Sequence, residues 1–284
     1  MKFSNEEQAE ILIHALPYIQ KYYGKTIVVK YGGNAMIDEN LKQSVMQDVV
    51  LLSLVGVKVV LVHGGGPEIN TAYKAYGKET IKVDGLRYTD KDGADIVQMV
   101  LAGKVNKDLV KIIGTKGGKA IGLSGMDGSM IKCKFKNEDK YGYVGEIVDI
   151  NPDVINTSLN NGYIPVISTV GTDDEGNSYN INADTAAARI AGALNAEAFI
   201  AVTDIKGLLR DKNDDTTLIH EINVSELKTL EKQGIIDGGM IPKVECCVEA
   251  RRRGVSKVFI IDGRVPHAIL IEVLTDEGIG TMFK

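Results

Sequence analysis

Two glycine clusters, each directly after a run of apolar β-branched residues, constrain the fold of this chain most. The run at residues 26–31 leads into Gly32-Gly33, and the run at residues 57–62 leads through His63 into Gly64-Gly65-Gly66. Such runs are typical of strands buried on both faces, and the glycines predict a tight turn that opens a helix. There the backbone N–H groups are unpaired, the helix dipole adds positive charge, and an anion can approach closely. Two such turns predict a site for several anionic groups, which indicates phosphoryl transfer.

The rest of the chain alternates between strand and helix patterns. We predict strands at residues 26–31, 57–62, 119–124, 163–168, 198–203 and 257–262. We predict helices at residues 4–23, 39–55, 67–77, 90–113, 152–161, 183–194, 225–233, 243–253 and 266–274. This order is typical of an α/β fold whose mostly parallel sheet is covered by helices on both faces. Residues 131–150 alternate polar and apolar side chains, so we expect an antiparallel hairpin that lies over a ligand.

Length and composition exclude several classes of protein. A chain of 284 residues forms one large domain or two modest ones, and we expect the turn-rich loop at residues 171–178 to divide two lobes. The net charge of −5 lacks the basic excess that binds nucleic acid or anionic membranes. No apolar run reaches the ~18 residues of a membrane span. The three cysteines, Cys133, Cys246 and Cys247, lack zinc or redox spacing, so we expect a cytoplasmic protein.

The first predicted helix precedes the first core strand. Ser4 and Glu7 form the pattern of a capping box, and Pro17 predicts a kink near Ile13. The helix is amphipathic, which fits two interpretations. It covers the sheet, or it is an oligomerisation arm that exchanges with another subunit, and the sequence leaves both open.

Two lysines lie beside glycine turns. Lys30 ends a buried strand, where an unpaired ammonium is costly, and the adjacent glycines favour a phosphate contact over a side chain that merely extends to water. Lys243 follows Asp237-Gly238-Gly239 and lies in a first helical turn. The positive end of the helix dipole disfavours a lysine there unless an anion is bound.

A polar segment and an arginine turn complete the pattern. Asn182 or Asp184 caps the following helix, or else the alternation of Asn180, Asn182 and Asp184 puts amides and a carboxylate on one side of an extended segment. In the second case the carboxylate would orient the two lysines. Arg87 lies in a polar turn and suits bidentate capture of a carboxylate, although loop arginines are usually solvated. We expect His63 to hydrogen-bond its loop rather than to act as a base.

These motifs, from about Lys25 to the C-terminus, resemble in order and spacing those of the acetylglutamate kinases, a family of the amino acid kinase superfamily. The resemblance implies a three-layer α/β/α sandwich around a mostly parallel sheet. It also implies transfer of the ATP γ-phosphate, with Mg²⁺, to the side-chain carboxylate of N-acetyl-L-glutamate, the second step of arginine biosynthesis by the acetylated route. A carboxylate with an ordinary pKa of ~4.3 is ionised at neutral pH and needs no general base. The alternatives are a kinase of the superfamily that acts on glutamate, carbamate or a nucleoside monophosphate, or a non-catalytic arginine sensor.

The resemblance also implies roles for single residues. Charge on the transferring phosphoryl group would be offset by Lys30, Lys243 and the N–H groups of Gly33 and Gly65, with Asp184 holding the lysines. Acetylglutamate would bind to Gly65, Gly66, Arg87, Asn180 and Asn182. The nucleotide would bind to Thr203, Asp204, Lys206, Gly207, Leu208, Ile235, Asp237 and Lys243. We therefore expect an arm at 1–24, an acetylglutamate lobe at 25–178 and an ATP lobe at 179–284, with no protein-held metal.

The two ends of the chain resemble the arginine-inhibited, hexameric branch of the family. Glu272 and Gly278 match that branch, whereas Phe259 stands where a histidine is expected. The resemblance implies a homo-oligomer, either a dimer or a hexamer built as a trimer of dimers, with arginine bound beside the N-terminal helix.

Overall fold

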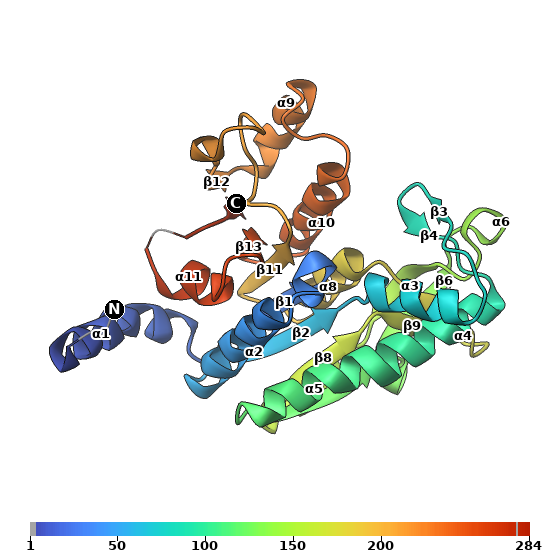
Figure 1. The fold of residues 1–284 in the computed structure, drawn as a ribbon, viewed down its shortest axis with the longest axis horizontal. Helices are drawn as coiled ribbons and strands as arrows, with labels where there is room; N and C mark the ends of the chain where they lie inside the picture. Colours follow the sequence, from blue (N-terminus) through green and yellow to red (C-terminus); the bar gives the residue numbers. More distant parts are fainter. Residues whose placement is uncertain (1–3, 277) are drawn as a thin grey trace.

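An eight-stranded sheet forms the middle layer of the molecule (Figure 1). The structure is a computed structural model, and it describes residues 4–276 and 278–284. The strand order is β12-β14-β13-β11-β1-β2-β8-β5, and neighbours are parallel except for β13 and β14. The strands are β1 Thr26–Tyr31, β2 Lys58–His63, β5 Ala120–Ser124, β8 Ile164–Ser168, β11 Ala198–Thr203, β12 Glu221–Ile222, β13 Lys257–Asp262 and β14 Thr281–Phe283. The six predicted strands are confirmed, and β12 and β14 were not predicted.

Alternate side chains of each strand pack into two separate cores. In β1, Val28 faces one core, whereas Ile27 and Val29 face the other. The first core is closed by α7 Asp153–Asn160, α8 Ala183–Ala193 and α10 Met240–Arg252. The second is closed by α2 Glu39–Leu54, α5 Asn106–Thr115 and α11 Ala268–Leu274. The predicted three-layer α/β/α sandwich is therefore confirmed.

One predicted helix is not a single α-helix. Residues 90–113 fold as α4 Lys91–Gln98, the π-helix η2 Met99–Val105 and the start of α5. The apolar pattern predicted the helical path but not the π-helix, because buried residues recur at helical spacing in both α4 and α5 and the pattern does not report the hydrogen-bond register between them. The remaining helices are α3 Gly66–Ala75, α6 Glu138–Tyr141, α9 Leu227–Lys232 and the 3₁₀ turns η1 Gly33–Met36, η3 Asp127–Ser129, η4 Asp215–Thr217 and η5 Val224–Glu226.

A smaller sheet, in the order β10-β9-β6-β7, lies beside the main one. Its strands are β6 Ile131–Phe135, β7 Gly145–Ile150, β9 Val170–Thr172 and β10 Ser178–Asn180, and a separate two-stranded hairpin pairs β3 Lys82–Val83 with β4 Leu86–Arg87. The antiparallel pairing of β6 with β7 confirms the predicted hairpin. The loop that we expected to divide two lobes is the turn between the paired strands β9 and β10. The main sheet continues across both expected lobes, because β1 pairs with β11.

The N-terminal helix α1 Asn5–Tyr22 extends away from the sheet (Figure 1). Its capping box is confirmed by the reciprocal bonds between Ser4 and Glu7. Leu12 and Ile13 are 72% and 67% exposed, and Tyr22 is the buried residue of the helix. The interpretation of this helix as a cover for the sheet is therefore wrong, because its apolar side chains face away from the core.

Candidate active site

The two glycine turns lie side by side at the carboxyl edge of the main sheet. They follow β1 and β2, which are neighbours, and Gly64 N donates to Tyr31 O at 3.2 Å. The second turn opens α3 as predicted, with Gly65 at the N-cap, whereas the first opens the 3₁₀ turn η1. Ligands of open α/β sheets bind at this edge.

Lys30 lies near the carboxyl end of β1 and is 7% exposed. Its Nζ atom is 2.9 Å from Asp184 Oδ1, and the ammonium lies beside the first glycine turn, since a Cβ added at Gly32 would be 3.4 Å from Nζ. Asp184 belongs to the first turn of α8, whose N-cap Asn182 accepts from Thr185 N at 3.0 Å. The expected extended segment therefore ends at Asn182, and the capping interpretation is correct for this residue.

The residues that we expected to bind the acceptor line one cavity of about 210 Å³, namely Gly65, Gly66, Arg87, Asn180 and Asn182. Arg87 is half-buried and donates to Gly66 O at 3.2 Å, Asn70 Oδ1 at 2.5 Å and Thr80 Oγ1 at 3.1 Å. The solvated interpretation of Arg87 is therefore wrong. Asn180 Nδ2 donates to Thr89 Oγ1 at 3.1 Å, so the polar rim of the cavity is held in place.

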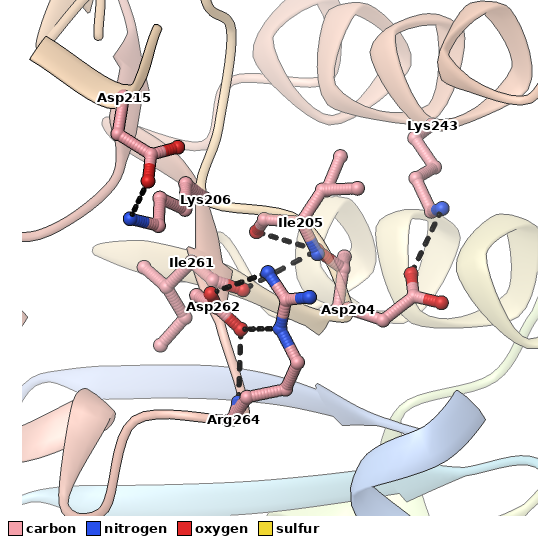
Figure 2. A network of polar contacts seen from close by, with 9 residues as sticks. Asp204, Ile205, Lys206, Asp215, Lys243, Ile261, Asp262 and Arg264 are labelled. Atoms are coloured by element: carbon pink, nitrogen blue, oxygen red, sulfur yellow. Dashed lines mark hydrogen bonds and ion pairs between the residues drawn. The ribbon is translucent and has the colours of Figure 1, made fainter. Parts of the chain in front are cut away.

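A second cavity, of about 530 Å³, lies at the carboxyl ends of β11 and β13 and at the start of α10 (Figure 2). Six of the residues expected to bind nucleotide line it, namely Asp204, Lys206, Gly207, Ile235, Asp237 and Lys243. Thr203 and Leu208 do not, because both side chains are buried beneath the loop. Thr203 Oγ1 donates to Ile261 O at 3.3 Å, and Leu208 N donates to Thr281 Oγ1 at 2.9 Å, so these two residues anchor the loop.

The two lysines are held by different carboxylates. Lys243 Nζ is 3.5 Å from Asp204 Oδ1 (Figure 2), whereas Asp184 pairs with Lys30. This corrects the expectation that Asp184 holds both lysines. Asp204, the partner of Lys243, directly follows β11. Asp184, the partner of Lys30, is the second residue of α8.

The second cavity also contains a cation that the sequence reasoning missed. Asp262 is 4% exposed at the end of β13, and it accepts from the backbone N of Arg264 at 2.9 Å, from Nε at 2.9 Å and from an Nη atom at 2.8 Å (Figure 2). Burial alone would raise the pKa of Asp262, but the Arg264 contacts lower it below its ordinary value. The sequence held one signal for this pair, since Arg264 follows two residues after Asp262, the last residue of β13.

The cysteines and acidic groups indicate no further chemistry. Cys133 and Cys246 are free thiols, and burial raises the pKa of each to about 12. No group of three or more histidine, cysteine, aspartate or glutamate side chains that could hold a metal ion occurs among the described residues. In the same part of the chain, no helix is both long and apolar enough to cross a membrane.

A third cavity, of about 230 Å³, lies between α1, β13 and α11 and contains Phe259, Glu272 and Gly278. Glu272 Oε2 accepts from Ile279 N at 2.9 Å and from Gly280 N at 3.1 Å. A Cβ added at Gly278 would be 2.9 Å from Glu272 Oε1, and φ at Gly278 is +48°. The turn therefore requires glycine beside this carboxylate.

The comparison with protein families agrees with this geometry. The model of the amino acid kinase family matches residues 25–262, which span both glycine turns, both lysines and every lining residue of the second cavity except Arg264. The chain belongs to the amino acid kinase family. Among its curated relatives, the acetylglutamate kinase of Brachyspira hyodysenteriae is 57% identical over 281 residues, covering 99% of this chain and 98% of that one. The acetylglutamate kinase of Clostridium kluyveri is 56% identical over 277 residues, covering 97% and 98%.

Solved structures of amino acid kinase family architecture superpose on most of the chain. An N-acetylglutamate synthase from Neisseria gonorrhoeae, complexed with coenzyme A and N-acetyl-glutamate, has a TM-score of 0.83 at 24% identity. It covers 97% of this chain, which spans 63% of the length of the synthase. The protein smu.665 from Streptococcus mutans has a TM-score of 0.74 at 29% identity and covers 91% of this chain and 98% of its own.

Proposed function

We infer that this chain is an acetylglutamate kinase, which transfers the γ-phosphoryl group of ATP to the side-chain carboxylate of N-acetyl-L-glutamate in arginine biosynthesis. The observation that carries the inference is the strand order β11-β1-β2. It puts Lys30, on β1, between the strand that leads into the larger cavity and the strand that leads into the glycine-lined cavity. The near-complete coverage of curated acetylglutamate kinases supports the same substrate.

The chemistry needs positioning and charge neutralisation. The acceptor carboxylate attacks the γ-phosphorus, a new P–O bond forms, and the bond from phosphorus to the bridging oxygen breaks, which releases ADP. No proton is transferred, since the carboxylate is already ionised near neutral pH. The negative charge on the transferring oxygens is offset by fixed donors, and such donors are the main source of rate in phosphoryl transfer.

The residues divide between these tasks. Lys30 and the N–H groups of Gly33 and Gly65 face the transferring group, and Asp184 orients Lys30. Gly66, Arg87, Asn180 and Asn182 bind the acceptor, with the Arg87 guanidinium on its α-carboxylate. Lys243 and the loop from Asp204 to Gly207 bind the nucleotide, together with Ile235 and Asp237.

Magnesium fits this site as part of the nucleotide. Mg²⁺ keeps several waters and binds through phosphate oxygens with one or two carboxylates. The carboxylates that line the second cavity, Asp204, Asp215 and Asp237, are each paired with a lysine, and the neighbouring Asp262 is paired with Arg264, which fits a metal held mainly by the phosphates. When bound, it supplies positive charge to the phosphate chain, as in other phosphoryl transferases.

An acceptor panel tests this function. The purified chain is incubated with MgATP and N-acetyl-L-glutamate, L-glutamate, carbamate or a nucleoside monophosphate. Turnover is followed by release of ADP, and any acyl phosphate is trapped with hydroxylamine. We expect product with N-acetyl-L-glutamate alone. Equal turnover with L-glutamate would overturn the substrate assignment, and arginine binding without turnover would favour the sensor alternative.

We also propose the organisation and regulation that the family resemblance implies. Residues 25–178 form the acceptor lobe and residues 179–284 the nucleotide lobe, with Asn180 and Asn182 of the second lobe reaching the acceptor, and both lobes share one sheet. The exposed apolar face of α1 makes residues 1–24 an arm that joins dimers into a hexamer, which sedimentation of the chain with and without 1–22 would test. Arginine binds in the third cavity beside Glu272 and Gly278 and inhibits the kinase. Fractionation of source cells would test the cytoplasmic location.

A further inference from the structure

A buried polar network lies directly beneath the second glycine turn. His63, the last residue of β2, and Asn106, the first residue of α5, are both fully buried. His63 Nδ1 is 2.8 Å from Gly64 O, and His63 Nε2 is 3.1 Å from Asn106 Nδ2. The turn is therefore linked through one imidazole to a helix on the outer layer of the fold.

The neighbours of Asn106 fix the direction of its amide. Its Nδ2 atom is 2.8 Å from Val166 O and 3.2 Å from Leu123 O, and both are acceptors. Its Oδ1 atom is 3.2 Å from Lys107 Nζ, which is a donor. The NH₂ group therefore faces His63 Nε2 and shares its two hydrogens among three acceptors, so Nε2 meets a donor. Gly64 O on the other side can only accept, and in a neutral imidazole the proton is therefore on Nδ1. Nδ1–H donates to Gly64 O.

The π-helix η2 packs against the same turn from the side. A Cβ added at Gly65 would be 2.6 Å from Leu101 Cδ2 and 3.2 Å from Val105 Cγ2, and both residues belong to η2. One residue inserted into an α-helix rotates everything after it by about 100°. The π-helix therefore lets Leu101 and Asn106 face the end of β2 together.

We infer that His63, Asn106 and η2 form one positioning element, which fixes the peptide groups of Gly64–Gly66 so that the N–H group of Gly65 faces the transferring phosphoryl group. The inference rests on the proposed function. The side chains of His63 and Asn106 do not line the glycine-lined cavity, so both residues act through the turn and not on the substrate. An Asn–His pair can hold the turn in place because the asparagine selects the Nδ1–H tautomer of the histidine, which then donates to the carbonyl of Gly64.

The imidazole stays neutral through the working range of the enzyme. Burial lowers the pKa of His63 to about 4, the Gly64 contact opposes that shift, and Lys107 on α5 adds to it. Two further charged groups lie beside the turn, namely Glu68 on α3, which faces Gly65, and Arg87 on β4, which donates to Gly66 O. The partner Asn106, rather than the solvent pH, therefore decides which nitrogen carries the proton.

The isosteric variant Asn106→Asp tests the element. In a neutral ring, a carboxylate beside Nε2 accepts a hydrogen bond from Nε2–H, so the one ring proton is on Nε2 and Nδ1 presents a lone pair to Gly64 O, whereas a protonated ring donates to both neighbours. We expect the ratio of the variant kcat to the wild-type kcat at the same pH to fall ~10-fold or more as the pH rises from about 6 to about 8.5. KM for ATP should change by less than about threefold. The matched variant Asn156→Asp, exposed on α7, should follow the wild type at every pH.

A flat ratio across this range would overturn the inference, because a merely structural defect lowers kcat equally at all pH values. If Asn106→Asp does not fold, ¹⁵N NMR of histidine-labelled wild-type protein decides the question. We expect His63 to show a protonated Nδ1 and an unprotonated Nε2 from about pH 5 to pH 9. The opposite tautomer, or titration within that range, overturns the inference. Failure of the proposed function is distinct, because the wild type would then be inactive in the acceptor panel.

Discussion

The ion pair between Lys30 and Asp184 makes the most demanding prediction. The two charges are 2.9 Å apart and their side chains are 9% and 21% exposed. At this separation the Coulomb attraction is about 6 kcal/mol with an effective dielectric constant of about 20. Desolvation of two ions offsets most of it, whereas removing one partner of a buried pair costs about 3–5 kcal/mol. Asp184→Ala should therefore lower the free energy of unfolding by about that amount, because it strands the less exposed charge.

The loss should depend on which partner is removed. Lys30→Ala leaves a carboxylate that water partly reaches, so its stability loss should be the smaller one. The same variant should retain acetylglutamate binding yet lose 10²–10³-fold in kcat, about 3–4 kcal/mol, since a donor to the transferring group is gone. In the double variant, the second substitution should cost less than it does alone, because its partner is already absent.

Denaturant unfolding, calorimetric binding and initial-rate kinetics measure these three quantities. Lys42→Ala is the matched control, since Lys42 also lies 2.9 Å from a carboxylate, but its partner Glu39 is 64% exposed. An exposed pair of this kind contributes roughly 0–1 kcal/mol and should leave turnover unchanged. Unchanged turnover in Lys30→Ala would remove this lysine from the mechanism. A loss of stability in Asp184→Ala no larger than that of the control would refute the argument from burial.

Further predictions concern the other charged pairs. Lys243→Met should raise KM for ATP about tenfold or more while KM for acetylglutamate stays within about twofold, as measured by initial rates; equal changes in both would count against a nucleotide role. Arg264→Met leaves Asp262 buried without its bidentate partner, so it should cost about 3–5 kcal/mol in chemical denaturation, and Asp262→Asn/Arg264→Met should recover part of that loss. Burial raises the pKa of Asp48 to about 6, so the folded state holds a proton that the unfolded state releases near pH 4. The unfolding free energy of the wild type relative to that of Asp48→Asn should therefore fall by on the order of 2–3 kcal/mol between pH 4 and pH 6.5. A constant difference between the two proteins would refute this. Glu272→Gln should weaken arginine inhibition at least ~10-fold without changing kcat, and inhibition equal to that of the wild type would move the arginine site elsewhere.

The sequence predicted the central sheet well because its strands are continuous apolar runs. Val59 to Val62 have no polar face, and only a strand covered on both sides buries such a run. The short strands β12 and β14 at one end of the sheet escaped prediction because two or three residues carry no periodicity, and pairing alone defines them. The π-helix η2 escaped prediction for a different reason, since apolar residues recur at helical spacing on both sides of it and their pattern does not report the hydrogen-bond register.

The site was predictable where one backbone feature fixes a side chain, and not where tertiary packing decides. The glycine turns that follow strands β1 and β2 predicted the positions of Lys30 and Gly65. The alternation used for Asp184 failed, because Asn182 starts a helix two residues earlier. Leu208 was misplaced because its chain neighbours line the cavity while its own side chain enters the core.

The hydrogen bond from Leu208 N to Thr281 Oγ1 spans 73 residues of sequence. At a synthesis rate of roughly 5–20 residues per second, the loop leaves the ribosome about 4–15 s before its anchoring strand does. β13 leaves the ribosome late in that interval, and until β14 follows, its edge has no antiparallel neighbour and stays open to pairing with another nascent chain. Slowing translation between these two segments should therefore lower the yield of native protein, whereas slowing it upstream of β11 should not.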